Sequence, residues 1–76
     1  MCLAVPGRVV ATFEEHAMRM ARVSFGGVER AVCLETLPEV REGDYVLVHV
    51  GFAIARIDEA EAARLLRELE ALDGTA

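Results

Sequence analysis

The sequence predicts a mainly β fold, a small five-stranded OB-like β-barrel followed by one amphipathic α-helix at the C-terminal end. Three observations support this class. Short β-branched and apolar segments recur through most of the chain, breaks that contain glycine separate them, and a leucine-rich stretch of helical period comes last. Short strands joined by tight turns are typical of small barrels, and we expect the helix to cover an open end or edge.

The size and charge of the chain limit what it can do. Its 76 residues make a single domain, 1–76, and a chain this short buries only about 60% of its unfolded surface. A deep catalytic cleft is therefore not expected. The net charge is −5, with 8 basic residues that are all arginine, which argues against nucleic acid as a partner.

Hydropathy and cysteine content indicate the compartment. No apolar run reaches the roughly 20 residues that a membrane span requires, and Arg8 interrupts the apolar start too early for a signal peptide. The two cysteines, Cys2 and Cys33, are too few for a disulfide framework. We therefore expect a cytoplasmic protein with reduced thiols and no membrane span.

The barrel is expected over residues 9–57, after a mobile N-terminal arm of residues 1–8 that contains Pro6-Gly7. We expect the first strand from about Arg8 and a turn at Glu14 to His16. Gly26-Gly27 supplies the positive φ angles of a tight hairpin. The polar segment Pro38 to Gly43 is predicted as a loop. The remaining strands are expected at Met18 to Phe25, Val28 to Glu35, Tyr45 to Val50 and, after Gly51, Phe52 to Ile57.

The last segment carries the signals of a helix, expected over residues 58–73. Asp58 is followed three residues later by Glu61, which is the pattern of an N-terminal capping box. Leucines and Ala62 then recur with helical period, and Gly74 is the natural stop. We expect the leucine stripe to face the core and only its exposed edge to offer a groove for a partner.

Cys2 stands where an ordinary fold needs no thiol. If the initiator methionine is removed, the α-amine and thiol of Cys2 lie on adjacent carbons and could chelate a metal ion. Their reference pKa values are about 8 and about 8.5, so a modest perturbation frees both groups at neutral pH. With Met1 retained, only the thiolate is available.

Two segments resemble signatures of one family, the HypC/HupF family of [NiFe]-hydrogenase maturation chaperones. The first is Met1-Cys2-Leu3-Ala4-Val5-Pro6-Gly7-Arg8-Val9, and the second is Gly43-Asp44-Tyr45-Val46-Leu47-Val48-His49-Val50-Gly51-Phe52-Ala53. The N-terminal motif is the more specific one, since many strands look like the second. The acid-rich helix start at Asp58 also fits, so that the resemblance extends from Met1 to the C-terminal helix.

The resemblance implies a carrier rather than an enzyme. Members of that family are OB-like barrels that hold the iron of the Fe(CN)2CO group transiently, together with a HypD-type iron-sulfur protein, and escort it to the hydrogenase large-subunit precursor. Carried over to this chain, the metal ligands are Cys2 and His49. Residues expected to contact the partner are Cys2, Leu3, Val5, Pro6 and Gly7. Thiolate and imidazole suit Fe(II), but two ligands leave the coordination sphere incomplete.

Alternatives remain open for several residues and for the function. His49 could equally be a hydrogen-bonded, partly buried side chain. Cys33 matches no family motif and is expected to be a small apolar filler, with metal binding as the less favoured alternative. A metal-free β-barrel interaction module would need neither Cys2 nor iron. A thiol enzyme, with the α-amine as base for Cys2, is disfavoured because no oxyanion arrangement and no third catalytic group are evident.

Overall fold

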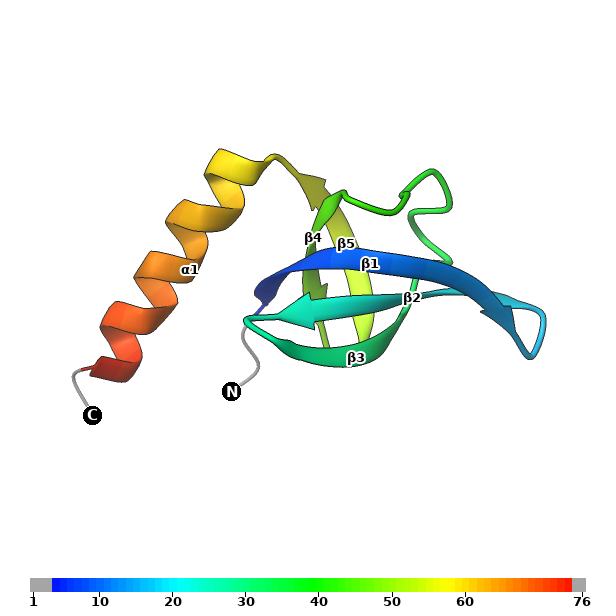
Figure 1. The fold of residues 1–76 in the computed structure, drawn as a ribbon, viewed down its shortest axis with the longest axis horizontal. Helices are drawn as coiled ribbons and strands as arrows, with labels where there is room; N and C mark the ends of the chain where they lie inside the picture. The colour runs from blue at the N-terminus through cyan, green and yellow to red at the C-terminus, as the bar shows by residue number, and fades with distance from the viewer. Residues whose placement is uncertain (1–3, 75–76) are drawn as a thin grey trace.

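The computed structural model describes residues 4–74 and shows a closed β-barrel followed by one helix (Figure 1). This agrees with the predicted class, a mainly β, OB-like barrel with a C-terminal helix. The elements are β1 (Val5–Glu15), β2 (Met18–Phe25), β3 (Val28–Cys33), β4 (Tyr45–His49), β5 (Phe52–Ile57) and α1 (Glu59–Gly74).

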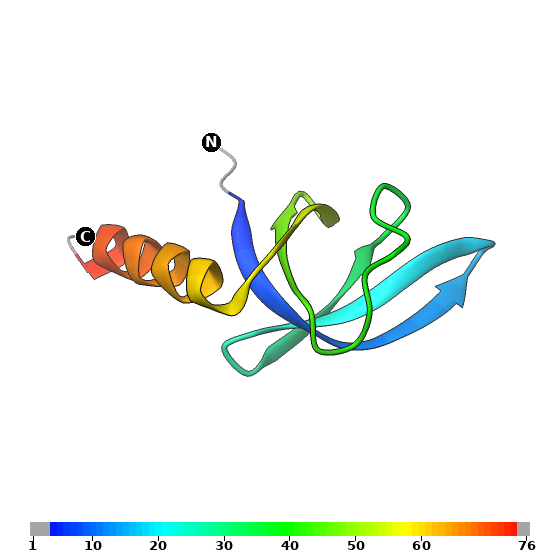
Figure 2. The ribbon, with the colours of Figure 1, turned by 90° about the horizontal axis from the view of Figure 1, so that it is seen from above.

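The strands close in the order β1-β2-β3-β5-β4, so that β4 returns to pair with β1. All neighbours are antiparallel except β3 and β5, which meet in parallel at Cys33 and Phe52. Seen from above, the β1–β2 hairpin extends to the end of the molecule opposite α1 (Figure 2). The barrel therefore has two distinct ends, and the start of β1 lies at the end nearer α1.

The first strand begins earlier than the sequence indicated. The prediction placed its start near Arg8, whereas β1 begins at Val5 and residues 5–8 pair with β4. The expectation of a mobile arm is therefore wrong for these residues, because Pro6 and Gly7 are paired opposite Leu47 and Val46 and both are buried. Residues 1–3 of the expected arm lie outside the described residues.

Two-residue turns with positive φ angles join three strand pairs. Gly26 and Gly27 form the turn between β2 and β3 as predicted, with φ of 63° and 99°. The turn expected at Glu14 to His16 lies instead at His16 and Ala17, because β1 continues to Glu15.

The third such turn joins β4 to β5 at Val50 and Gly51, so β4 ends one residue earlier than predicted. Val50 has φ of 52°, a conformation that costs an L-residue about 1–2 kcal/mol, and its branched side chain makes it a clear outlier. It is nevertheless 67% exposed.

The core fills the barrel with the inward side chains that the alternating pattern predicts. The fully enclosed members include Val9, Val23 and Val46, which come from three different strands. Val32 and Leu34 complete it from the end of β3, although β3 stops at Cys33 rather than at the predicted Glu35.

The loop between β3 and β4 is held firmly against the barrel. Two backbone hydrogen bonds join its end to β1. The Val9 N–H donates to the Asp44 carbonyl and the Gly43 N–H donates to the Val9 carbonyl, each at 2.8 Å. Val40 lies within this loop and is fully buried. The segment predicted as a polar loop therefore contributes a core residue.

The helix starts as the capping pattern predicts. The Glu61 N–H donates to the Asp58 carboxylate at 2.7 Å, and the helix runs to Gly74. It packs on β1 and β4 through Ala62, which is buried, whereas Leu66 remains 43% exposed. Leu65 and Leu69 are only half-buried, and none of these three leucines belongs to the core cluster, so the expectation that the leucine stripe faces the core is wrong. Leu66 is left open beside the start of β1.

Candidate functional site

The predicted site residues fall at two neighbouring places in the barrel. Val5, Pro6 and Gly7 form the first part of β1, and His49 is the last residue of β4. Cys2 and Leu3 lie outside the described residues. The structure therefore describes four of the six predicted positions.

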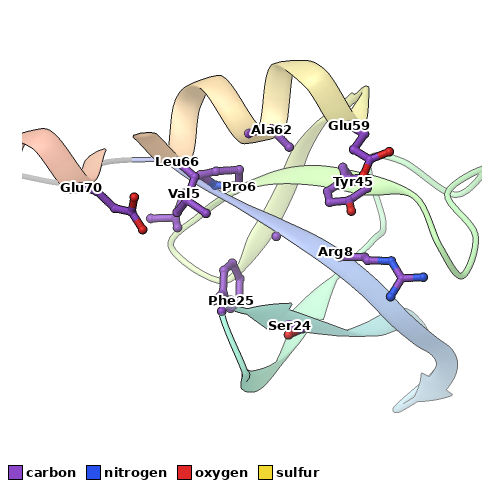
Figure 3. A pocket seen from close by; sticks show the side chains of 13 residues that line it. Val5, Pro6, Arg8, Ser24, Phe25, Tyr45, Glu59, Ala62, Leu66 and Glu70 are labelled. Atoms are coloured by element: carbon purple, nitrogen blue, oxygen red, sulfur yellow. The ribbon is translucent and has the colours of Figure 1, made fainter. Parts of the chain in front are cut away.

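Val5, Pro6 and Gly7 all line one groove, which we call the helix groove (Figure 3). It has a cavity volume of about 570 Å³ and runs between the first part of β1, the end of β2 and one side of α1. The other lining residues are Arg8, Ser24, Phe25, Gly26, Tyr45, Glu59, Ala62, Ala63, Leu66 and Glu70.

Local pairing explains why the groove forms here. Over Val5 to Gly7, β1 is paired with β4, whereas its pairing with β2 begins at Arg8. Proline has no backbone N–H to donate. It is tolerated here because residues 5–7 pair with β4 only and need no hydrogen bonds to a second strand. Pro6 lies close to Ala62 and Leu66 of the helix, and Phe25 lies on the other side of β1 (Figure 3).

Gly7 is required by packing rather than by a special backbone angle. A Cβ added here would lie 2.4 Å from Val23 Cγ1 and 2.7 Å from Phe25 Cε1, distances that real Cβ atoms essentially never show. The bare backbone of Gly7 therefore lets the Phe25 ring cover the start of β1. Since Gly7 is also buried, its described contacts stabilise the groove wall.

Charged groups stand around an otherwise apolar groove. Arg8 lies toward the end of the groove near Tyr45 and Glu59, and Glu70 lies near the other end (Figure 3). Among the described residues, none of these three charged side chains forms a salt bridge. The groove thus offers apolar contact with unpaired charges at its margins.

His49 does not line the helix groove but lies one residue beyond the β1–β4 ladder. Val5 pairs with Val48, so the next position in the same register sets Ala4 opposite His49. Because side chains alternate along a strand and Val48 belongs to the core, His49 faces outward, where it is half-buried. The closure of the barrel thus brings Ala4 beside His49, more than forty positions away in the sequence.

The described part of the chain holds no ready-made metal site. Within residues 4–74 no group of three or more His, Cys, Asp or Glu side chains is arranged to hold a metal ion. His49 therefore belongs to no such group within these residues. Any metal bound there needs further ligands from the N-terminal segment, from a second protein or from the cargo itself.

Cys33 does not line the helix groove, but only Phe52, which pairs with both residues, separates it from His49 in the sheet. Its N–H donates to the Gly51 carbonyl at 2.9 Å, and it is buried between its pairing partners Met20 and Phe52. The exposed fraction of Cys33 is 7%, in agreement with the prediction of a small apolar filler.

Sequence reasoning missed several residues of the groove. Phe25 and Tyr45 were assigned only to strands, and no local signal separates them from ordinary barrel residues. Leu66 was foreseen in part, because the open edge of the leucine stripe was expected to offer a groove. No helix within the described residues is long and apolar enough to cross a membrane.

The fold and these features define a small β-barrel with an apolar groove beside its C-terminal helix and an outward-facing histidine next to the start of β1. Comparison with known families makes the class specific. Residues 1–69 match the model of the HupF/HypC family, and the chain belongs to that family.

Similar proteins of known name cover most of the chain. This chain is 46% identical over 71 residues to the hydrogenase maturation factor HypC of Synechocystis, and the match covers 91% of this chain and 93% of that relative. It is 47% identical to HypC of Rhodobacter capsulatus, covering 95% and 78%. It is 42% identical to the hydrogenase maturation factor HybG of Escherichia coli K12, covering 96% and 93%. These relatives support a role in hydrogenase maturation.

Proposed function

We propose that this protein is a hydrogenase maturation chaperone that carries the iron of an Fe(CN)2CO unit on Cys2 and His49. It acts with a HypD-type iron-sulfur protein and delivers the unit to the [NiFe]-hydrogenase large-subunit precursor. In this role it is a carrier and not an enzyme. It works in the cytoplasm, where reducing conditions keep the Cys2 thiol free.

The observation that carries the proposal is the register between β1 and β4. Ala4 is the next position opposite His49, and residues two apart on a strand share a face. A chain that continues upstream from Ala4 in extended form would carry Cys2 onto the face of His49. A thiolate and an imidazole would then be available to the same iron ion.

An incomplete ligand set suits a carrier. Two protein ligands leave open positions for cyanide, carbon monoxide and a cysteine of the partner, so the iron unit can be received and released by ligand exchange. A closed structural site with four protein ligands would hold the metal too firmly for transfer. The absence of a three-residue donor cluster in residues 4–74 is compatible with such transient binding.

The thiol is tested by co-expression with a HypD-type partner under exclusion of oxygen. The wild-type pair should contain iron with infrared bands of cyanide and carbon monoxide, and Cys2→Ala should lose both while its melting temperature is unchanged. Cys33→Ala is the matched control because it removes the other thiol and should retain the bands. Hydrogenase maturation by Cys2→Ala at the wild-type level would refute the carrier role of Cys2.

The histidine is tested in the same complex. His49→Ala should reduce iron retention more than it reduces stability, because the side chain is half-buried on the outer face and lies outside the core cluster. His16→Ala, in the exposed turn at the far end of the barrel, is the control. Unchanged iron content together with a lowered melting temperature would assign His49 to the fold instead.

A metal-free interaction module is the second candidate, and the helix groove favours it. The groove is large and apolar, and it needs no metal to accept a partner segment. Full partner binding in the presence of a chelator and with the Cys2 thiol alkylated would support this alternative. Loss of binding under both treatments would support the iron-carrying role.

A further inference from the structure

A second apolar surface lies at the barrel end on the other side of Val5 and Phe25. This surface, the barrel-end hollow, is lined by Val5, Phe25, Val28, Arg30, Val48 and Val50 and has a volume of about 340 Å³. We propose that the barrel-end hollow binds a segment of a partner protein in which a large apolar side chain stands next to a carboxylate. This binding requires no iron and is separate from the proposed role of Cys2.

Val50 is the first observation that points to a ligand. It occupies a positive-φ position in the two-residue turn after β4, where asparagine is the favoured residue before Gly51. Its side chain is 67% exposed, so its own burial contributes little to the fold. A strained position that displays an exposed branched apolar side chain is better explained by contact with another molecule than by turn formation.

Val28, the first residue of β3, adds a second exposed branched side chain beside the neighbouring turn. It follows Gly26-Gly27 directly and is 52% exposed. Its partner across the hairpin is Phe25, which also lines the hollow. Two adjacent turns of the barrel thus present apolar side chains to the same space.

Arg30 determines the chemistry of the ligand. It pairs with the core residue Val23 in the β2–β3 ladder, so it leaves the sheet on the side of the barrel interior and reaches the hollow. The neighbouring acid, Glu29, pairs with Arg22 instead, with 3.9 Å between Glu29 Oε1 and Arg22 Nε. Arg30 itself has no ion pair among residues 4–74. A free guanidinium beside an apolar hollow favours a carboxylate next to an apolar side chain.

The positive charge of Arg30 also argues against two other possible occupants of the barrel-end hollow. Residues 1–3, although close in sequence to Val5, carry no side-chain carboxylate to meet Arg30. A second copy of this chain docked symmetrically through this surface would bring its own Arg30 near the first. The net charge of −5 gives no general attraction for acids, so recognition of a carboxylate must come locally from Arg30.

The test is a titration of methyl-labelled protein with short peptides, followed by NMR. Acetyl-Gly-Leu-Glu-Gly-amide at millimolar concentration should shift the methyl signals of Val28, Val48 and Val50. Acetyl-Gly-Leu-Lys-Gly-amide should bind at least about tenfold more weakly, and Arg30→Gln should weaken binding of the acidic peptide by about the same factor. Equal affinity for both peptides, or shifts confined to Leu66 in the helix groove, would overturn the proposal.

Two turn variants separate binding from folding. Val50→Asn should raise the melting temperature by about 5 °C because asparagine suits the turn, yet weaken binding of the acidic peptide by about fivefold. Ala17→Gly relieves a positive-φ residue, φ 63°, at the second position of the distant β1–β2 turn and should leave binding unchanged. A lowered melting temperature for Val50→Asn would show that Val50 serves the fold and would refute the inference.

The remaining occupants give distinct results. Nuclear Overhauser contacts between Leu3 and Val28 or Val50 in the free protein would show that the chain fills its own hollow. A concentration-dependent doubling of the rotational correlation time, abolished by Arg30→Glu or Val50→Asn, would show a dimer through this surface. Either result would overturn the proposal of a partner segment.

Discussion

Replacement of Gly7 by alanine is the sharpest test of how the groove wall is built. The added Cβ would lie 2.4 Å from Val23 Cγ1 and 2.7 Å from Phe25 Cε1. Val23 is fully buried and branched, so it cannot retreat, whereas the half-buried ring of Phe25 can move outward. Overpacking of this kind costs about 1–3 kcal/mol, so we expect Gly7→Ala to lower the free energy of unfolding by about 2 kcal/mol.

Thermal and urea denaturation measure this change. In a domain of this size 1 kcal/mol shifts the melting temperature by about 4–8 °C, so a decrease of roughly 10 °C is expected. Phe25→Leu removes the outer ring atoms that meet the new methyl group. The double variant Gly7→Ala/Phe25→Leu should therefore be more stable than additivity predicts, with a coupling of about 1 kcal/mol.

The outcome also distinguishes two roles for Gly7. If the Gly7→Ala variant melts within about 2 °C of the wild-type protein, the close packing described for Val23 and Phe25 is wrong. In that case a defect in partner binding would have to come from a direct contact at Gly7. A large loss of stability without such a defect, measured well below the melting temperature, would leave Gly7 with a packing role only.

Three further changes follow from the described contacts. Val40→Ala should lower the free energy of unfolding, measured by urea denaturation, by about 2 kcal/mol because Val40 is fully buried. Glu39→Ala, at the exposed neighbouring position, should lower it by less than about 0.5 kcal/mol. Asp58→Ala removes the 2.7 Å cap of α1 and should cost about 1 kcal/mol, while Asp58→Asn should retain most of it; equal losses would exclude capping as the cause. Cys33→Ala should cost about 1 kcal/mol, and Cys33 should react with a thiol reagent only as fast as the barrel opens, measured under native conditions. Rapid modification without unfolding would contradict its burial.

Local signals in the sequence were sufficient for most of the elements. Gly26-Gly27 marks a hairpin because both residues adopt positive φ, and Asp58 marks the helix start because its carboxylate caps a free N–H. The alternation of Val46 and Val48 with their neighbours correctly assigns the inward face of β4. In these cases the physical cause lies within a few residues of the signal.

Features that arise from distant pairing were not predictable. Pro6-Gly7 reads locally as a break, but pairing with β4 makes these residues part of β1. Val40 stands alone in a polar segment, and its burial depends on how the loop is held against the barrel. The neighbourhood of Ala4 and His49 likewise follows from the closure of β1 against β4, which no single segment encodes.

The early start of β1 also limits how far the proposed cargo can travel. An anchor at Arg8 would allow Cys2 to range about 20 Å from the barrel, whereas the anchor at Val5 leaves three residues and about 10 Å. The largest volume that this chain length allows the thiol to reach is thus about eightfold smaller. The proposed transfer therefore resembles docking of two surfaces more than delivery by a swinging tether, and an acceptor site must open within about 10 Å of this barrel end to receive the iron.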